Sequence, residues 1–154
     1  FRDMSDFNLT ICGKKDEDFA IAYKKELFET SNIHYAGFIN LSSEDFKKIR
    51  EESIGLIFPS CSEGSSGGVV TAMHAGLIPI ISYESGVDIK DFGIILKENT
   101  IAEIKKQILQ LSQLSSDNLK NKAVKTWEYA NKYYTRENFS KEYNDFVVNL
   151  IKNK

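Results

Sequence analysis

The residues best suited to chemistry lie in one stretch near the middle of the chain. Positions 59–76 read PSCSEGSSGGVVTAMHAG, in which a single carboxylate, Glu63, precedes a run of small residues. A helix that begins in such a run presents N–H groups without intrahelical partners, and its dipole adds partial positive charge, so its start favours anions. We expect Glu63 to accept hydrogen bonds from hydroxyl groups attached to a bound phosphate, as in a sugar phosphate. The predicted phosphate-binding residues are Ser65, Ser66, Gly67 and Gly68.

A simpler interpretation is that these are turn and capping residues, which a short loop before a helix uses in any case. The stretch is not a Walker A motif, because no GK[ST] follows, and it is not a GxGxxG fingerprint. The residue types alone therefore leave both interpretations open.

The elements around this stretch alternate between strands and helices. Short apolar runs predict five strands, at residues 8–12, 33–36, 53–58, 77–82 and 93–96. Helical spacing predicts helices over 19–28, from 43 onward and over 67–75, with Ser42 or Ser43 and Ser65 or Ser66 as N-caps and Gly76 after the last of them. Three further helical stripes follow, at 101–111, 119–134 and 139–150.

Strands that alternate with helices require right-handed crossovers and hence a parallel sheet. We expect an α/β fold with one open, parallel, five-stranded sheet and helices on both faces, which is Rossmann-like. The C-terminal helical tail is expected to pack back on the same core, and residues 1–154 are expected to form a single domain. Pro79 would remove a ladder donor, so the fourth strand should pair poorly there or start at the proline. Ligands bind at the carboxyl ends of the strands in such sheets, where the stretch from Pro59 begins.

Composition narrows the function. The 20 basic and 22 acidic residues give a net charge of −2, so nucleic acid is not the expected partner. No apolar run approaches the roughly 20 residues that span a bilayer, and the N-terminus does not read as a secretory signal. Cys12 and Cys61 fit no metal motif and are interpreted as reduced thiols, which indicates a cytoplasmic protein without a metal. The first residue is Phe1 and not methionine, which suggests an excised fragment.

Residues 54–82 (IGLIFPSCSEGSSGGVVTAMHAGLIPIIS) resemble the signature region of retaining GT-B glycosyltransferases of family 4. The shared features are a strand ending in Pro-Ser, a Glu-Gly pair, a small-residue loop that opens a helix, an Ala-Met-x-Ala-Gly helix end and a strand with proline near its start. Residues 9–13, 34–38 and 85–86 resemble flanking parts of the family in the same order. The resemblance covers most of residues 8–98.

The resemblance implies a role for each matching residue. Glu63 matches the first glutamate of the family's paired-glutamate motif, which contacts donor-sugar hydroxyls, and is the implied catalytic residue. Ser66, Gly67 and Gly68 match the loop whose amides meet the donor sugar and diphosphate. Thr71 stands where the second, ribose-binding glutamate would fall, and offers one hydroxyl in place of a carboxylate. Phe38 and Ile39 match the segment that receives the base.

The resemblance also implies the function of the whole. The chain would be the C-terminal lobe of an enzyme that binds a nucleoside-diphosphate sugar, needs no cofactor, and transfers the sugar with retention to an acceptor held by an N-terminal lobe. The family's lobe begins with a strand and an Arg/Lys-containing loop, and this chain starts after both. We therefore expect the strand order 2-1-3-4-5, since the neighbours of the missing strand would pair directly, and an isolated chain that is inactive and binds donor weakly. A cytoplasmic location is expected, with peripheral membrane association of the full-length protein left open.

Two other functions remain as alternatives. One is a degenerate glycosyltransferase lobe that serves as a non-catalytic binding or scaffold module, and Thr71 favours it. The other is a receiver-like signalling module, which needs an aspartate after the third strand. Pro59 and Ser60 stand there instead, which argues against a receiver.

Overall fold

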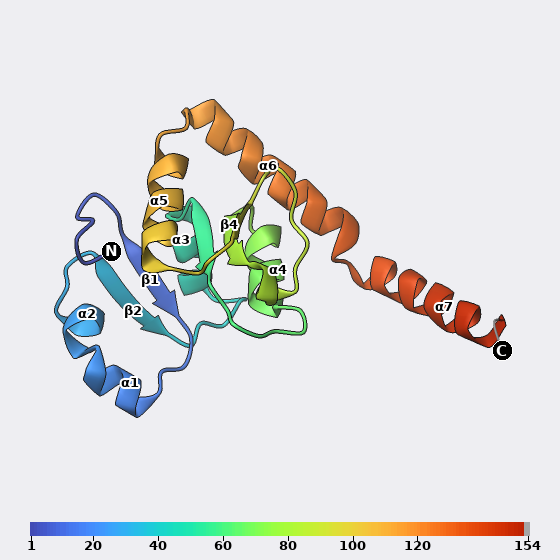
Figure 1. Ribbon diagram of the computed structural model, residues 1–154, viewed down its shortest axis with the longest axis horizontal. Helices are drawn as coiled ribbons and strands as arrows, with labels where there is room; N and C mark the ends of the chain where they lie inside the picture. The colour runs from blue at the N-terminus through green and yellow to red at the C-terminus, as the bar shows by residue number, and fades with distance from the viewer. Residues whose placement is uncertain (153–154) are drawn as a thin grey trace. The chain divides into compact units, whose positions relative to one another are not determined.

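The computed structural model describes residues 1–152 (Figure 1). The chain divides into two compact α/β units, Phe1–Glu52 and a second unit that begins at Ser53. Each unit contains its own parallel sheet. We call them unit 1 and unit 2.

Unit 1 holds a two-stranded sheet and three short helices. Its elements are β1 (Leu9–Cys12), α1 (Glu17–Ala22), α2 (Lys24–Phe28), β2 (Ile33–Gly37) and α3 (Glu44–Glu51). The single helix predicted over 19–28 is two helices that meet at Tyr23, whose φ of −112° departs from helical values. Ser43 caps α3 as predicted, because its side chain accepts a hydrogen bond from the Phe46 N–H.

The N-terminal segment of unit 1 is tied to the turn before β2. The side-chain amide of Asn32, which is only 8% exposed, donates to the carbonyl groups of Phe1, Met4 and Phe7 at 2.8–3.0 Å. A single buried side chain therefore satisfies three backbone acceptors of a segment without regular structure.

Unit 2 holds a three-stranded parallel sheet of order β3-β4-β5 and four α-helices among its described residues. Its elements are β3 (Gly55–Phe58), α4 (Gly67–His74), β4 (Ile78–Ser82), a 3₁₀ turn η1 (Tyr83–Ser85), β5 (Ile94–Leu96), α5 (Ile101–Ser112), α6 (Ser116–Tyr133) and α7 (Arg136–Lys152). All five strands and the C-terminal helices thus lie close to their predicted positions.

The prediction of one five-stranded sheet is wrong. β1 pairs with β2 and β3 pairs with β4, as expected, but the described residues form no ladder between β1 and β3. Each of these two strands has only four residues, and nearly all of them are partly exposed. Backbone groups on such an edge can bond to water, so leaving it unpaired costs little, and nothing forces the direct pairing.

Pro79 lies inside the central strand of unit 2, opposite Leu56 of β3. Alternate residues of a parallel strand bond to opposite neighbours, and the Ile78 N–H bonds to the Ile54 carbonyl on the β3 side. The nitrogen of Pro79 therefore faces β5, whose ladder begins one residue later, at Ile80. The missing N–H falls where no ladder bond is needed, so the strand pairs normally.

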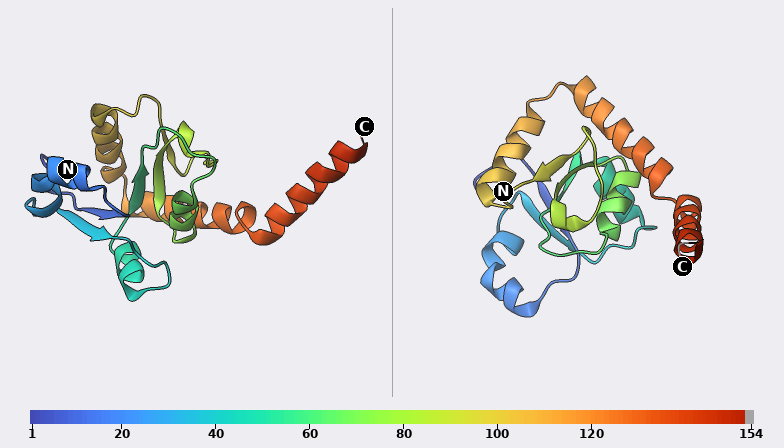
Figure 2. Two further views of the ribbon diagram at one scale, coloured as in Figure 1. Left: turned by 90° about the horizontal axis from the view of Figure 1, so that it is seen from below. Right: turned by 45° about the vertical axis from the view of Figure 1, so that its right-hand side comes forward.

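The core of unit 2 joins α4 to the sheet and to α6. Its buried members are Val69, Met73, Ile81, Val87, Phe92 and Ala130. α4 packs on β3 and β4, α6 packs on α4 and β4, and α5 packs on β5. The prediction that the whole tail packs on this core is wrong for α7, which leaves the end of α6 as a separate helix and buries no residue (Figure 2). None of its residues within 136–152 is buried, so packing does not hold it to the core.

Candidate functional site

The start of α4 is fixed by a buried serine. Ser66 is 5% exposed and is the N-cap, since its Oγ accepts a hydrogen bond from the Val69 N–H at 3.4 Å. The first backbone bond of the helix runs from the Val70 N–H to the Ser66 carbonyl at 3.1 Å. The N–H groups of Gly67 and Gly68 therefore precede the hydrogen-bond ladder of the helix.

The space around these two glycines is open. A Cβ at Gly67 would meet no atom of the described residues within 4 Å, and one at Gly68 would meet only the Ser66 Oγ, at 3.8 Å. The inner side of α4 packs through Val69 and Met73, both fully buried. The helix is thus anchored in the core while its first N–H groups are accessible, which is the arrangement that suits an anion.

Glu63 lies in the loop before α4, and its side chain is exposed. Its N–H donates to the Glu84 carbonyl at 2.9 Å, which ties the backbone of the loop to η1. Ser65, two residues on, is also exposed. The loop therefore keeps a carboxylate and a hydroxyl within four residues of the α4 N-terminus.

Thr71 lies on α4 one turn after Gly67 and is partly buried. Residues four apart lie on the same face of a helix, so its hydroxyl is on the face that begins at Gly67. Phe38 and Ile39 follow β2 in unit 1; Phe38 is 74% exposed and Ile39 is partly buried. That these two residues receive the base of a nucleotide stays a prediction.

The electrostatics of the loops around the α4 N-terminus are unusual for an anion site. Residues 59–71 and 82–86 contain no lysine or arginine, and they contain two carboxylates, Glu63 and Glu84. Within these segments, the helix start and its N–H groups carry the only positive partial charge. An anion held only in this way is held weakly.

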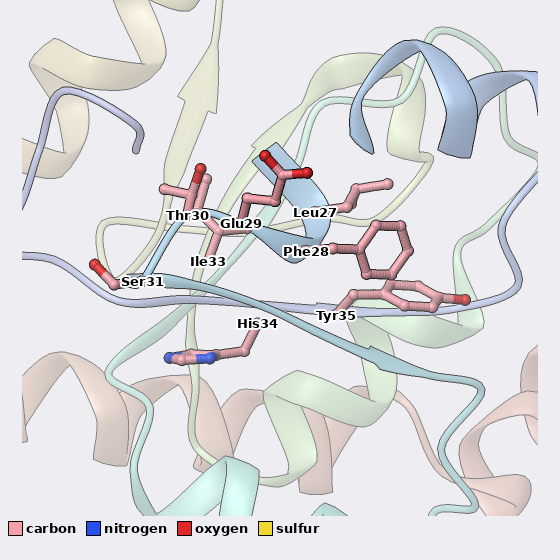
Figure 3. A pocket seen from close by; sticks show the side chains of 8 residues that line it. All are labelled: Leu27, Phe28, Glu29, Thr30, Ser31, Ile33, His34 and Tyr35. Atoms are coloured by element: carbon pink, nitrogen blue, oxygen red, sulfur yellow. The ribbon is translucent and has the colours of Figure 1, made fainter. Parts of the chain in front are cut away.

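A hollow of about 440 Å³ lies in unit 1 and contains none of the predicted site residues (Figure 3). It runs along β2, where His34 and Tyr35 point to opposite sides of the strand, as successive strand residues do (Figure 3). The hydroxyl of Tyr35 donates to the Gly13 carbonyl at 2.9 Å. Because it is open and its polar groups do not converge, we assign it no ligand.

Residues 1–152 contain no cluster of three histidine, cysteine or acidic side chains able to hold a metal ion. In the same range no helix is long and apolar enough to cross a membrane.

Ser82 and the segment after β4 have a role at this site that was not predicted from the sequence. The Ser82 Oγ donates to the Ser60 carbonyl at 2.6 Å, and Ser82 is fully buried. In a single sequence, a serine at a strand end that bonds to a distant carbonyl looks the same as one that faces solvent. Gly86 was visible as a glycine in a loop, but its contact with the loop before α4 was not.

Comparison with known proteins gives a fold and no family. No protein-family model matches the sequence, and no curated protein matches it. Among solved structures, the chain is similar to the crystal structure of WaaG, a glycosyltransferase involved in lipopolysaccharide biosynthesis. The TM-score is 0.64 at 21% sequence identity, and the match covers 86% of this chain and 35% of that one. At this identity the likeness shows that the chain has a glycosyltransferase-like fold, and it spans about a third of the length of the solved structure.

Proposed function

We propose that the chain is the donor-binding lobe of a GT-B glycosyltransferase. One observation carries this proposal: the start of α4, where a buried cap, Ser66, positions the N–H groups of Gly67 and Gly68 a few residues after an exposed carboxylate, Glu63. The glycosyltransferase-like fold supports this reading over the many other functions of α/β proteins.

Each site residue then has a role in the proposal. The amides of Ser65, Gly67 and Gly68 meet the diphosphate, and Glu63 accepts hydrogen bonds from the sugar hydroxyls in the reaction. Ser66 acts only as the cap, because its own N–H already donates to the Ser85 carbonyl. Thr71 meets the ribose with one hydroxyl. Phe38 and Ile39 receive the base.

The rest of the enzyme is part of the same proposal. A nucleoside-diphosphate sugar is the donor, residues 1–154 form one lobe, and an N-terminal lobe holds the acceptor. Transfer proceeds with retention, and the protein is cytoplasmic. Since residues 59–71 and 82–86 contain no basic side chain, this chain alone should bind donor in the millimolar range and transfer nothing.

The test is a titration of the chain with UDP-, GDP- and ADP-glucose, followed by the NMR amide signals of Gly67 and Gly68. We expect saturable shifts at millimolar concentrations of at least one of the three. Submicromolar binding would contradict the account of weak anion binding, and unshifted amides with all three would contradict the proposed site.

Gly67→Pro is the sharpest variant. Proline is favoured at the first helical position, and Ser66 already has the extended backbone (φ −73°, ψ 107°) that a residue before proline adopts. The variant therefore keeps the helix and removes one N–H. It should weaken binding several-fold, whereas Gly67→Ala, which keeps the N–H and has room for the methyl group, is its matched control.

A second function rests on Thr71, which provides no carboxylate for ribose. If none of the three donors binds, the chain is a degenerate lobe that serves as a non-catalytic binding or scaffold module. Thr71→Glu separates the two cases: it should strengthen donor binding if the site is otherwise complete, and it should change nothing in a scaffold.

A further inference from the structure

The loop before α4 is held along its whole length by the segment that follows β4. At residue 60, the Ser82 Oγ donates to the Ser60 carbonyl at 2.6 Å. In the middle, the Glu63 N–H donates to the Glu84 carbonyl at 2.9 Å, and at the end the Ser66 N–H donates to the Ser85 carbonyl at 3.0 Å. Three hydrogen bonds thus join residues 60–66 to residues 82–86. We call residues 82–86 the brace.

Gly86 makes the closest approach between the two segments. Its φ is 65°, in the left-handed region, and a Cβ there would overlap the Gly64 carbonyl oxygen and lie 3.3 Å from the Ser65 Cα. Both neighbours are backbone atoms, which cannot rotate away as the end of a side chain can. A side chain at position 86 must therefore displace the backbone directly after Glu63.

The brace is anchored in the core of unit 2, unlike the loop that it holds. Ser82 and Ser85 are fully buried, and β4 pairs on both sides with β3 and β5. In contrast, residues 61–65 are all exposed. The position of the loop is therefore set from the brace, and not by packing of its own side chains.

We propose that Gly86 and Ser82 are positioning residues, which place the Glu63 carboxylate relative to the first N–H groups of α4. This inference rests on the proposed function for its effect on donor binding. The other half of the inference, that the brace orders the loop before α4, does not depend on the proposed function.

The first test measures hydrogen exchange of the Glu63 and Ser66 amides in the whole chain, by NMR. In Gly86→Ala both amides should exchange at least roughly tenfold faster, because their acceptors no longer align. Gly76→Ala is the control: it places alanine at a φ of 79°, but its Cβ would lie 3.7 Å from the nearest atom, the Ala123 carbonyl oxygen, away from the loop. Equal exchange at Glu63 and Ser66 in the two variants would overturn the proposal.

Gly86→Asn separates crowding from backbone strain. Asparagine tolerates left-handed backbone better than alanine does, but it carries the same Cβ. It should therefore speed exchange as much as Gly86→Ala does, and recovery of wild-type protection would show that strain at position 86, and not crowding of the loop, is the cause.

Ser82→Ala is a milder variant, for use if those at position 86 do not fold. It removes only the bond to Ser60 and should speed exchange at Glu63 and Ser66 by a smaller factor. Ser85→Ala is its control, because the Ser85 Oγ is buried without a partner among the described residues and the variant keeps the carbonyl that Ser66 uses. Unchanged exchange in Ser82→Ala, or an equal effect of Ser85→Ala, would contradict the proposal for Ser82.

The second test asks whether position 86 acts through Glu63, using whichever of UDP-, GDP- or ADP-glucose binds the wild-type chain best. Gly86→Ala and Glu63→Gln should each weaken binding several-fold, and the double variant should be no weaker than the worse single one. Additive losses would mean that Gly86 does not act through Glu63. If no donor binds the wild type, the proposed function fails, while the exchange result still decides whether the brace orders the loop.

Discussion

At the scale of single residues, the chain relies on side chains that bond to backbone groups. Ser66, Ser82 and Asn32 are each almost fully buried, and each bonds to main-chain atoms of another segment or of a helix start. The Arg2–Asp3 and Lys125–Asp91 ion pairs are solvent-exposed, and such pairs contribute little. Among polar residues, the positions most sensitive to substitution should therefore be the buried ones with backbone partners.

Glu63→Gln should impair sugar transfer and leave the fold intact. The carboxylate is exposed and belongs to no core contact, so the free energy of unfolding should change by less than about 0.5 kcal/mol. A hydrogen bond to a charged group contributes about 1.5–3 kcal/mol, so turnover should fall roughly 10- to 150-fold. The measurement is transfer by the chain joined to its acceptor-binding lobe, with Glu128→Gln, at an exposed position of α6, as control. Near-normal turnover would remove Glu63 from the site.

Asn32→Asp should destabilise unit 1. The variant replaces an N–H₂ donor with a carboxylate, which faces the carbonyl oxygens of Phe1, Met4 and Phe7. Loss of the donor together with three unsatisfied acceptors should cost about 1–3 kcal/mol in urea unfolding. Asn131→Ala, which removes one exposed bond to the Trp127 carbonyl, is the control and should cost less than about 0.5 kcal/mol. Equal losses in the two variants would refute the importance of burial at position 32.

At the scale of elements, local signals in the sequence located nearly every strand and helix. The predicted serine N-caps and the predicted glycine after α4 are confirmed, because both depend on backbone geometry within a few residues. Ser43 and Ser66 cap their helices, and Gly76 has a φ of 79°. The break at Tyr23 was missed because no proline or glycine marks it. The partners of Glu63 were missed because they lie about twenty residues away in the chain, and one sequence carries no record of such contacts.

The start of α5 shows a further local pattern and gives a pH-dependent prediction. Thr100 caps the helix, and the Glu103 carboxylate accepts N–H groups of Lys97, Glu98 and Asn99 at 2.8–3.1 Å. Hydrogen bonds from Lys97 first, and then from Glu98 and Asn99, lower the pKa of Glu103 below its usual value of 4.5. A lowered folded-state pKa stabilises the fold above the unfolded-state pKa, and this contribution is lost as the pH falls through the folded-state value.

Glu103→Gln should therefore be less stable than the wild type near pH 7, and the difference should shrink as the pH falls below about 4.5. Urea unfolding of both proteins between pH 7 and pH 3 measures it. A difference that does not change with pH would mean that the charge of Glu103 has no part in holding residues 97–99.

At the scale of the whole molecule, the described chain has one substantial buried core, and it lies in unit 2. The cluster around Val69, Met73 and Ile81 draws on β3, β4, α4, α6 and the segment before β5. Unit 1 has a two-stranded sheet and no comparable cluster. The strand pairs β1–β2, β3–β4 and β4–β5 were predictable from the alternation of elements. The division into two sheets was not, because a four-residue strand carries no local signal for an edge that stays unpaired.

Residues 53–154 expressed alone should fold in one cooperative transition, since all members of the core cluster lie within them. Residues 1–52 alone should be largely unfolded, because two strands and three short helices bury too little apolar surface. Circular dichroism and the dispersion of NMR amide signals measure both. A poorly dispersed spectrum for residues 53–154 would contradict the assignment of the core.

The two free thiols are native labelling sites, one in each unit, for a distance measurement. Cys12 ends β1 in unit 1 and Cys61 lies two residues before Glu63 in unit 2; both are free and exposed. Nitroxide labels on these native cysteines would report the separation of the two units by double electron–electron resonance, without any engineered site. Partial desolvation raises the pKa of the Cys12 thiol, so its reaction with a methanethiosulfonate label should accelerate steeply on going from pH 7 to pH 9. A labelled pair would then show directly whether the distance distribution narrows when a nucleotide sugar is added.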